Sequence, residues 1–244
     1  MLSNILELYN NRDIKALDEL AIPTFRVLNT MSNFSSVIIV NCNDIKQLNN
    51  IESIEAKCIM LDLTNTKQEE DRHLALLFCA TYLCSHREYD KKLIIQVNSL
   101  NSGGYEEITY LNQFMPDAIV VSNINNSKEV KNVLALLHED VELHLCIQTS
   151  ESWHNLATLR CEPRVSTFYL GILSLLDDMK LDISIINLDN PTMRYMLSHF
   201  LVTCKAMGAK PVSFLCKNSS QENSWLEFEK NMGYDSKLFS NSVV

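Results

Sequence analysis

The chain has 244 residues, of which 46% are hydrophobic and 21% charged, the balance of an ordinary globular protein. Its net charge of -9 argues against a general nucleic-acid-binding protein, because neutralising phosphates requires clustered Lys and Arg. Its apolar runs are far shorter than the ~20 residues that a membrane-spanning helix needs, so we expect no membrane segment.

The first 36 residues are interpreted as a helical segment followed by a polar, irregular lead-in. A roughly helical apolar stripe predicts an amphipathic helix or a helix pair over Leu2 to Leu20; its members are Ile5, Leu6, Leu8, Leu17 and Leu20. Glu7 interrupts the apolar stretch and no basic leader precedes it, so we expect no signal peptide.

From Val37 onward, apolar segments alternate with helical patterns. Strands are predicted at residues 37–40, 58–63, 92–98, 117–122, 143–147 and 165–170. Asp44 is predicted to cap a helix through Leu48, and Ser127 to cap a helix through Leu137. Strands that are apolar throughout and alternate with helices indicate parallel pairing with both sheet faces covered. The pattern predicts an α/β fold, a (β/α)8 barrel, with a doubly wound open sheet as the alternative.

The pattern is less regular after residue 170. Residues 183–187 fit a strand locally but also a loop outside the sheet; a helix at 192–207, a strand at 211–216, a helix at 222–232 and a last strand at 236–239 follow. No helical pattern follows the last predicted strand, so we expect that strand to lack a covering helix. We therefore expect the Leu2–Leu20 segment to cover the open side of the barrel near Leu238, in its own subunit or in a neighbour. The predicted division is residues 1–36, the helical segment and lead-in, and residues 37–244, the barrel.

The eight cysteines include no C-x-x-C pair, and several lie in or beside apolar runs, where thiols pack as small hydrophobes. We expect them to be reduced and the protein to be cytoplasmic.

The ends of the fifth and sixth strands carry polar segments, where an α/β enzyme built on a parallel sheet places its chemistry. A barrel enzyme that uses a divalent metal needs carboxylates there, because hard cations take oxygen ligands. This chain has Gln148 and Ser174 instead, and neither side chain carries charge.

The strand segments in order resemble the strand motifs of the citrate lyase β-subunit and malyl-CoA lyase family, within the HpcH/HpaI aldolase superfamily. The segments are VIIVNCND, CIMLDLTNT, KKLIIQVNSLNSGGYEEI, PDAIVVSNINNSKEV, LHLCIQTSES, FYLGILSLLDDMKLD, CKAMGAKPVSF and MGYDSKLFSNS. The resemblance covers roughly Val37 to the end of the sequence. It implies a TIM barrel, Mg2+ held by a Glu and an Asp, an Arg that grips the substrate, and cleavage or formation of a C–C bond, often on CoA thioesters.

When the family's functional positions are aligned with this chain, few of the functional residues are kept. The family's Asp after the second strand is kept as Asp62, and the Asn after the third as Asn98. Gln96 replaces the Arg that grips the substrate, and Glu151 replaces the Arg after the fifth strand. Gln148 and Ser174 stand where the family has its two metal-ligand carboxylates. The candidates at the barrel mouth are therefore Asp62, Gln96, Asn98 and Glu151, and no metal or other cofactor is expected.

Two functional hypotheses follow. The first is a citrate-lyase-β-like barrel that has lost Mg2+-dependent lyase chemistry, a pseudoenzyme acting as a binding or assembly subunit in a metabolic pathway. It would form a homo-oligomer or bind a partner enzyme, with a small carboxylate as a candidate ligand. The alternative is an active C–C lyase or aldolase with a rebuilt site that holds Mg2+ through Asp62, Glu151, Asp177 or Asp178.

Other motifs have a plainer interpretation that we favour. Asp177-Asp178 is more typical of a solvated helix end than of a metal pair, and Ser102-Gly103-Gly104 of a turn than of a phosphate-binding loop. The spacing of His138 and His144 fits no common metal site. For Trp153-His154, a ligand pocket and helix packing both remain open.

Overall fold

The computed structural model describes residues 2–23, 37–54, 56–64, 68–86, 91–214, 222–234 and 236–240. The predicted lead-in at residues 24–36 and the end of the strand predicted at 211–216 lie outside these ranges.

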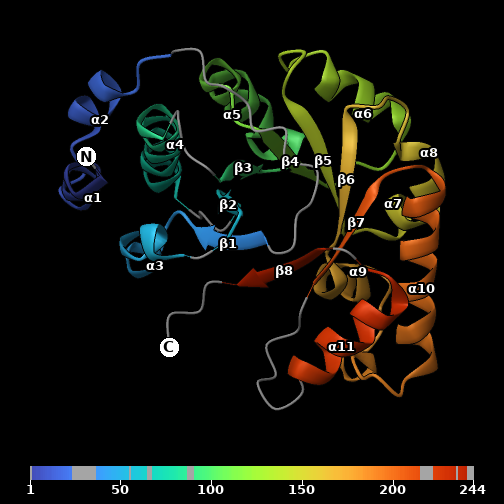
Figure 1. Cartoon of the computed structure of the whole chain (residues 1–244). Coiled ribbons are helices and arrows are strands. Elements are labelled where there is room, and N and C mark those ends of the chain that lie inside the picture. The colour runs from blue at the N-terminus through green and yellow to red at the C-terminus, as the bar shows by residue number, and fades with distance from the viewer. Residues whose placement is uncertain are drawn as a thin grey trace.

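Eight parallel strands close into a barrel, each paired with the strands before and after it in the chain (Figure 1). They are β1 (Val37–Asn41), β2 (Cys58–Asp62), β3 (Lys92–Val97), β4 (Ala118–Ser122), β5 (Glu142–Ile147), β6 (Val165–Leu170), β7 (Lys210–Phe214) and β8 (Ser236–Ser240). β8 pairs with β1 through Leu238 and Val37, which closes the ring. The predicted (β/α)8 barrel is confirmed, and the open-sheet alternative is wrong.

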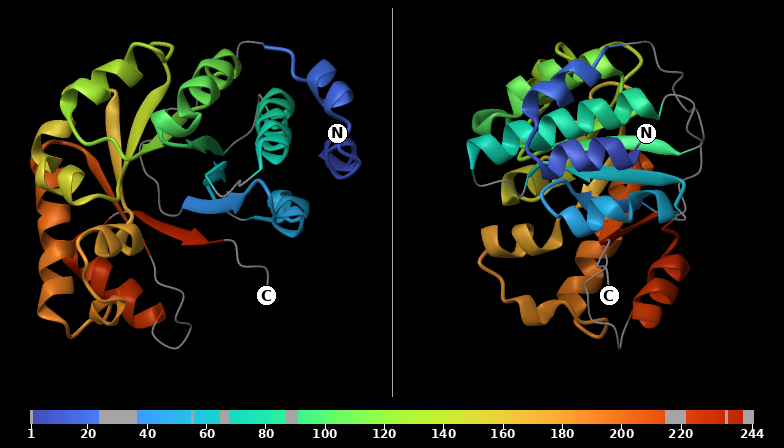
Figure 2. Two further views of the ribbon diagram at one scale, coloured as in Figure 1. Left: turned by 180° about the vertical axis from the view of Figure 1, so that it is seen from behind. Right: turned by 90° about the vertical axis from the view of Figure 1, so that its left-hand side faces the viewer.

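Helices connect successive strands on the outside of the barrel (Figures 1 and 2). They are α3 (Ile45–Asn49), α4 (Glu69–Ser85), α5 (Gly104–Leu111), α6 (Ser127–Leu134), α7 (Ser150–His154), α8 (Leu156–Leu159), α9 (Ile172–Asp178), α10 (Pro191–Ala206) and α11 (Glu222–Met232). Short 3-10 turns at Ile51–Ser53, Leu100–Ser102, Asn112–Phe114 and Ile183–Ile185 complete the connections.

The helix starts were predicted with mixed success. Asp44 caps α3 as predicted, because its carboxylate accepts the backbone N–H groups of Lys46 and Gln47. Ser127 does not cap α6. Asn126 does, because its Oδ1 accepts the N–H groups of the second and third residues after it. Within the segment 183–187, Ile183–Ile185 form a 3-10 turn outside the sheet, so the strand interpretation of that segment is wrong.

Of the two predicted alternatives, one helix or a pair, the N-terminal segment forms the pair, α1 (Leu2–Asn10) and α2 (Ile14–Leu20), and both pack on α4 (Figure 1). The Tyr9 hydroxyl donates to the Cys42 carbonyl at 2.6 Å, and its ring meets Phe78 of α4 edge-on at 5.5 Å. The expectation that this segment covers the barrel near Leu238 is therefore wrong: Ile5, Leu6 and Leu17 of its apolar stripe are buried where the segment packs on α4, and Leu238 belongs to the inner core of the barrel.

The apolar core has two layers, set by the alternation of side chains along each strand. The inner layer fills the barrel with Val37, Ile39, Cys58, Met60, Ile94, Ala118, Val120, Cys146, Tyr169, Val212 and Leu238. The outer layer lies between strands and helices and includes Ile59, Leu61, Ile95, Val121 and Leu145. Below, the mouth is the end of the barrel where the strands finish, and the base is the end where they begin. Within the described residues, none of the helices is both long and apolar enough to cross a membrane.

Candidate functional site

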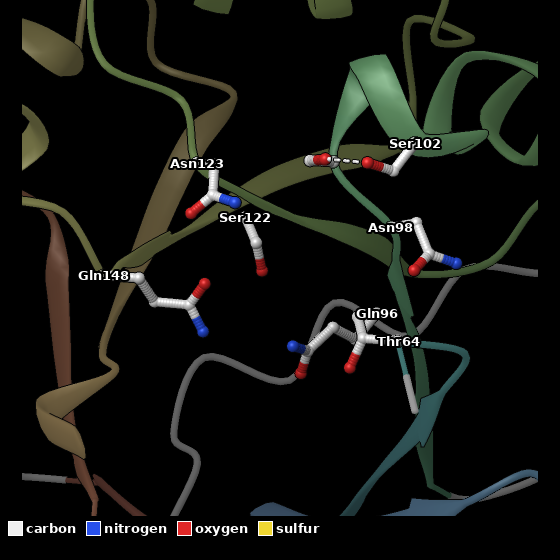
Figure 3. A pocket seen from close by; sticks show the side chains of 8 residues that line it. Thr64, Gln96, Asn98, Ser102, Ser122, Asn123 and Gln148 are labelled. Atoms are coloured by element: carbon white, nitrogen blue, oxygen red, sulfur yellow. Dashed lines mark hydrogen bonds between the residues drawn. The ribbon is translucent and has the colours of Figure 1, made fainter. Parts of the chain in front are cut away.

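A cavity of about 230 Å3 lies at the mouth of the barrel (Figure 3). Its walls come from the ends of β2 to β5 and the loops that follow them. The lining residues are Thr64, Gln96, Asn98, Ser99, Ser102, Ser122, Asn123 and Gln148. All eight side chains carry a hydroxyl or a carboxamide, so the described lining is polar and uncharged.

The alternation of the strands directs three of these side chains inward. Gln96 follows Ile94 by two residues on β3, Ser122 follows Val120 by two on β4, and Gln148, directly after β5, follows Cys146 by two. Each preceding residue belongs to the inner core. The same periodicity that fills the barrel with apolar side chains therefore ends in a ring of polar groups at its mouth.

Asn98 is held in one orientation by Glu107 of α5. The Asn98 Nδ2 donates to Glu107 Oε1 at 2.7 Å and to the Leu63 carbonyl at 3.3 Å, and the Asn98 backbone N–H donates to Glu107 Oε2 at 2.8 Å. Both amide hydrogens are thus engaged away from the cavity, and Figure 3 shows the Asn98 oxygen turned toward the other lining residues. Glu107 is 2% exposed, and burial raises its pKa, against the lowering effect of the Asn98 hydrogen bonds and of Arg72.

The Ser99–Gly104 loop closes one side of the cavity. Ser99 Oγ donates to Ser102 Oγ at 3.0 Å. Gly103 has φ of 95°, a left-handed conformation that suits glycine, and a Cβ on Gly104 would lie 2.1 Å from the Asn98 carbonyl oxygen. These glycines therefore serve the turn that places Asn98 and Ser102, in agreement with the favoured interpretation of this motif as a turn.

Ser122 is the most unusual lining residue. It is 6% exposed, yet its Oγ makes no hydrogen bond with the described part of the protein. Figure 3 shows this hydroxyl pointing into the space between Gln148 and Gln96. The next residue, Asn123, has φ of 58°, a left-handed conformation that asparagine tolerates better than most residues. Buried hydroxyls normally have partners, so this one faces a position where a bound molecule or water belongs.

The structure divides the sequence-predicted residues into two groups. Gln96, Asn98 and Gln148 line the cavity together. Asp62, Glu151 and Ser174 are not among its lining residues; Glu151 is exposed on α7, and Ser174 is exposed on α9.

The acidic residues near the mouth have local structural roles. Asp62 Oδ1 accepts hydrogen bonds from the backbone N–H and the hydroxyl of Thr64, at 2.9 and 2.6 Å, which turns the chain after β2. Asp178 Oδ2 accepts from the backbone N–H and hydroxyl of Ser150 at the start of α7, and these bonds lower the pKa of its carboxyl. The described residues contain no group of three or more His, Cys, Asp or Glu side chains placed to hold a metal ion.

The donor set at the mouth does not fit Mg2+. This ion sheds its water reluctantly and is usually held through carboxylates, whereas Gln148 offers a neutral amide and Ser174 a neutral hydroxyl on an exposed helix face. Gly171, at the end of β6, leaves room for the Gln148 side chain, because a Cβ there would lie 2.4 Å from Gln148 Cγ.

The remaining candidates lie elsewhere. His144 is fully buried at the base, within hydrogen-bonding distance of Glu142 and Tyr169, and burial lowers its pKa. Trp153 packs on the ring of His199 in α10 at 5.1 Å, so helix packing is the correct interpretation of that residue. His138 lies 3.5 Å from Asp140 on the surface.

The sequence reasoning missed Glu107 and the unpartnered hydroxyl of Ser122. Glu107 could have been found, because it interrupts the buried stripe of α5 formed by Gly104, Ile108 and Leu111. An acid on the buried face of a helix needs a partner. No pattern in the sequence could have predicted that the Ser122 hydroxyl is unpartnered in the described protein, because its hydrogen bonds depend on neighbours from other strands.

No family model matches the chain, and no curated protein matches it by sequence. Solved structures do match. RipC from Yersinia pestis is 13% identical with a TM-score of 0.67, over 85% of this chain and 88% of that chain. Protein CitE from Mycobacterium tuberculosis, in complex with magnesium and acetate, is 12% identical with a TM-score of 0.70, over 87% of each chain. A citrate lyase from Burkholderia xenovorans is 10% identical with a TM-score of 0.70, over 91% and 76%. These likenesses confirm the fold that the sequence resemblance implied.

Proposed function

We propose that this chain is a divergent relative of the citrate lyase β-subunits that has lost Mg2+-dependent C–C lyase chemistry and acts as a binding or assembly subunit in a metabolic pathway. The observation that carries the proposal is the uncharged described lining of the mouth cavity: Gln96, Ser122 and Gln148 occupy the inward positions at the ends of three adjacent strands. A neutral amide at position 96 cannot give the charged, bidentate grip on a carboxylate that an Arg gives.

The metal argument supports the same proposal. Losing both carboxylates removes the local charge that would hold the ion against its hydration shell. By the resemblance, Gln148 and Ser174 occupy the positions of the two ligand carboxylates. In this chain, Gln148 directly follows β5 and Ser174 lies in the first turn of α9.

The experiment is a Mg2+ titration by calorimetry on the parent protein and on Gln148→Glu/Ser174→Asp. We expect the double variant to bind Mg2+ measurably and the parent to give no binding heat. The matched control is Gln148→Asn/Ser174→Thr, which changes the same side chains without adding charge and should behave as the parent does. Tight Mg2+ binding by the parent would overturn the proposal.

The alternative, an active lyase with a rebuilt site, is supported by the solved neighbours that contain magnesium. This alternative requires acidic side chains that turn toward the mouth when Mg2+ binds. Asp62 and Asp178, however, accept hydrogen bonds from Thr64 and Ser150 that such a turn would break. Cleavage of a carboxylate or acyl-CoA substrate that depends on added Mg2+ would favour this alternative.

We further propose that the protein works in the cytoplasm as a homo-oligomer or with a partner enzyme of the same pathway. Exposed apolar side chains on the outer helices, such as Tyr195 and Val202 of α10, are available for such contacts. Light scattering of the purified chain tests the homo-oligomer.

A further inference from the structure

We infer that the mouth cavity binds a small uncharged polyhydroxy compound, with the Ser122 hydroxyl as a hydrogen-bonding group inside the site. This inference rests on the proposed function, because it assigns a ligand to a mouth that no longer holds a metal and a carboxylate. Its first support is Ser122 itself, whose buried Oγ points into the cavity and has no partner in the described protein.

The size of the cavity favours a small molecule over one water. Its volume is about 230 Å3, whereas a water molecule takes about 30 Å3 of the liquid. Ser122 therefore faces a space that holds a compound of several heavy atoms.

The absence of charge from the described lining disfavours the carboxylate and phosphate ligands that the family resemblance implies. A carboxylate or phosphate that leaves water needs a cation or several charge-assisted hydrogen bonds in return. The described lining offers hydroxyls and carboxamides only. A neutral ligand pays no comparable desolvation cost here.

The mixture of donors and acceptors fits hydroxyl groups, which both donate and accept. Asn98 presents its oxygen as a fixed acceptor, because Glu107 and the Leu63 carbonyl take both of its amide hydrogens. The carboxamides of Gln96 and Gln148 make no hydrogen bond with the described residues, so each offers an acceptor and two donors. No aromatic side chain lines the described walls, which disfavours a stacked nucleobase.

The test uses saturation-transfer NMR of the full chain with matched pairs of neutral and anionic compounds: glucose with gluconate, and glycerol with glycerate. We expect saturation transfer to glucose or glycerol at least fivefold stronger than to the matching anion. We expect Ser122→Ala to reduce the neutral signal at least fivefold while keeping its melting midpoint. The control is Ser198→Ala, the same change on the exposed part of α10, which should leave the signal intact.

Two results would overturn the inference. One is stronger transfer to the anions, and the other is no transfer to either member of both pairs. In either case an absence of Mg2+ binding would leave the proposed loss of lyase chemistry standing, so the two failures are distinguishable. A neutral signal that survives in Ser122→Ala would remove Ser122 from the site.

Discussion

The two ends of strands β3 and β5 differ in charge, one end lying at the base of the barrel and the other at its mouth. β3 begins with Lys92 at the base and carries Gln96 at the mouth, and β5 begins with Glu142 at the base and leads into Gln148 at the mouth. The charged side chains of these strands thus lie at the end where a barrel usually gains stability, and the neutral ones at the end where it usually has its chemistry.

The base is a connected network. His144 Nε2 lies 3.1 Å from Glu142 Oε2, and His144 Nδ1 lies 3.2 Å from the Tyr169 hydroxyl. Ser166 donates to Glu142 at 2.6 Å, and Lys92 Nζ lies 3.6 Å from its other oxygen. At the mouth, by contrast, Ser122 is buried and its hydroxyl has no partner among the described residues. The comparison teaches that the base uses its polar groups for folding, whereas the mouth keeps hydrogen-bonding capacity unused.

The largest expected effect tests the scaffold that joins the two ends. Leu145 of β5 is fully buried in the outer layer, between His144 and Gln148 in sequence. We expect Leu145→Ala to lower the free energy of unfolding by about 2–5 kcal/mol through the cavity it leaves. Urea denaturation measures the change. Val202→Ala, at a side chain that is 64% exposed, is the control and should shift stability by about 0.5 kcal/mol or less.

The next effect tests the base. Tyr169→Phe deletes a buried hydroxyl and leaves His144 Nδ1 without this partner. We expect a loss of about 1–3 kcal/mol in the free energy of unfolding, the cost of an unsatisfied buried polar group. An unchanged urea midpoint would show that the base network contributes nothing to folding.

The third effect is a dependence of stability on pH. Burial lowers the pKa of His144 in the folded state, so below about pH 6.5 the unfolded chain takes up a proton that the folded chain does not. The contribution of His144 to the free energy of unfolding is therefore complete above pH 6.5. It is lost as the pH drops, by at most about 1.4 kcal/mol per pH unit.

The titration of Glu142 also makes stability fall as the pH drops, but at lower pH. Burial opposes its ionisation, but hydrogen bonds from His144 and Ser166 and the charge of Lys92 prevail and lower its pKa to about 2. Its contribution is lost between its usual pKa of about 4.3 and this value. Unfolding curves at pH 7.5, 6.5 and 5.5 for the parent and His144→Gln isolate the histidine. If both proteins lose stability equally, His144 is not the titrating group.

The strands could be predicted from the sequence because strands buried on both faces are apolar throughout, and such runs stand out between helical patterns. Gln148 was placed at the mouth by its position after a predicted strand, and Gln96 by the resemblance to the citrate lyase family. The docking of α1 and α2 could not be predicted in this way. An amphipathic stripe indicates that a helix face is buried, but not which surface buries it.

The site was predicted in part for a related reason. Proximity to a strand end does not give the direction of a side chain. Asp62 is engaged by the turn that Thr64 makes two residues later, and α7 turns Glu151 to the outside. Glu107 is remote in sequence from every strand end, and only the packing of α5 brings it to Asn98.

The smallest expected effect completes the comparison, because it is the counterpart of Tyr169→Phe at the other end of the barrel. Ser122→Ala also deletes a buried hydroxyl from the barrel interior, but this hydroxyl has no partner in the described protein. Removing it breaks no internal hydrogen bond and relieves the cost of burying an unsatisfied group. We expect the free energy of unfolding, measured with urea in the absence of ligand, to stay the same or rise by up to about 1 kcal/mol. A loss as large as that of Tyr169→Phe would mean that the protein itself satisfies Ser122, and the distinction between the two ends would fail.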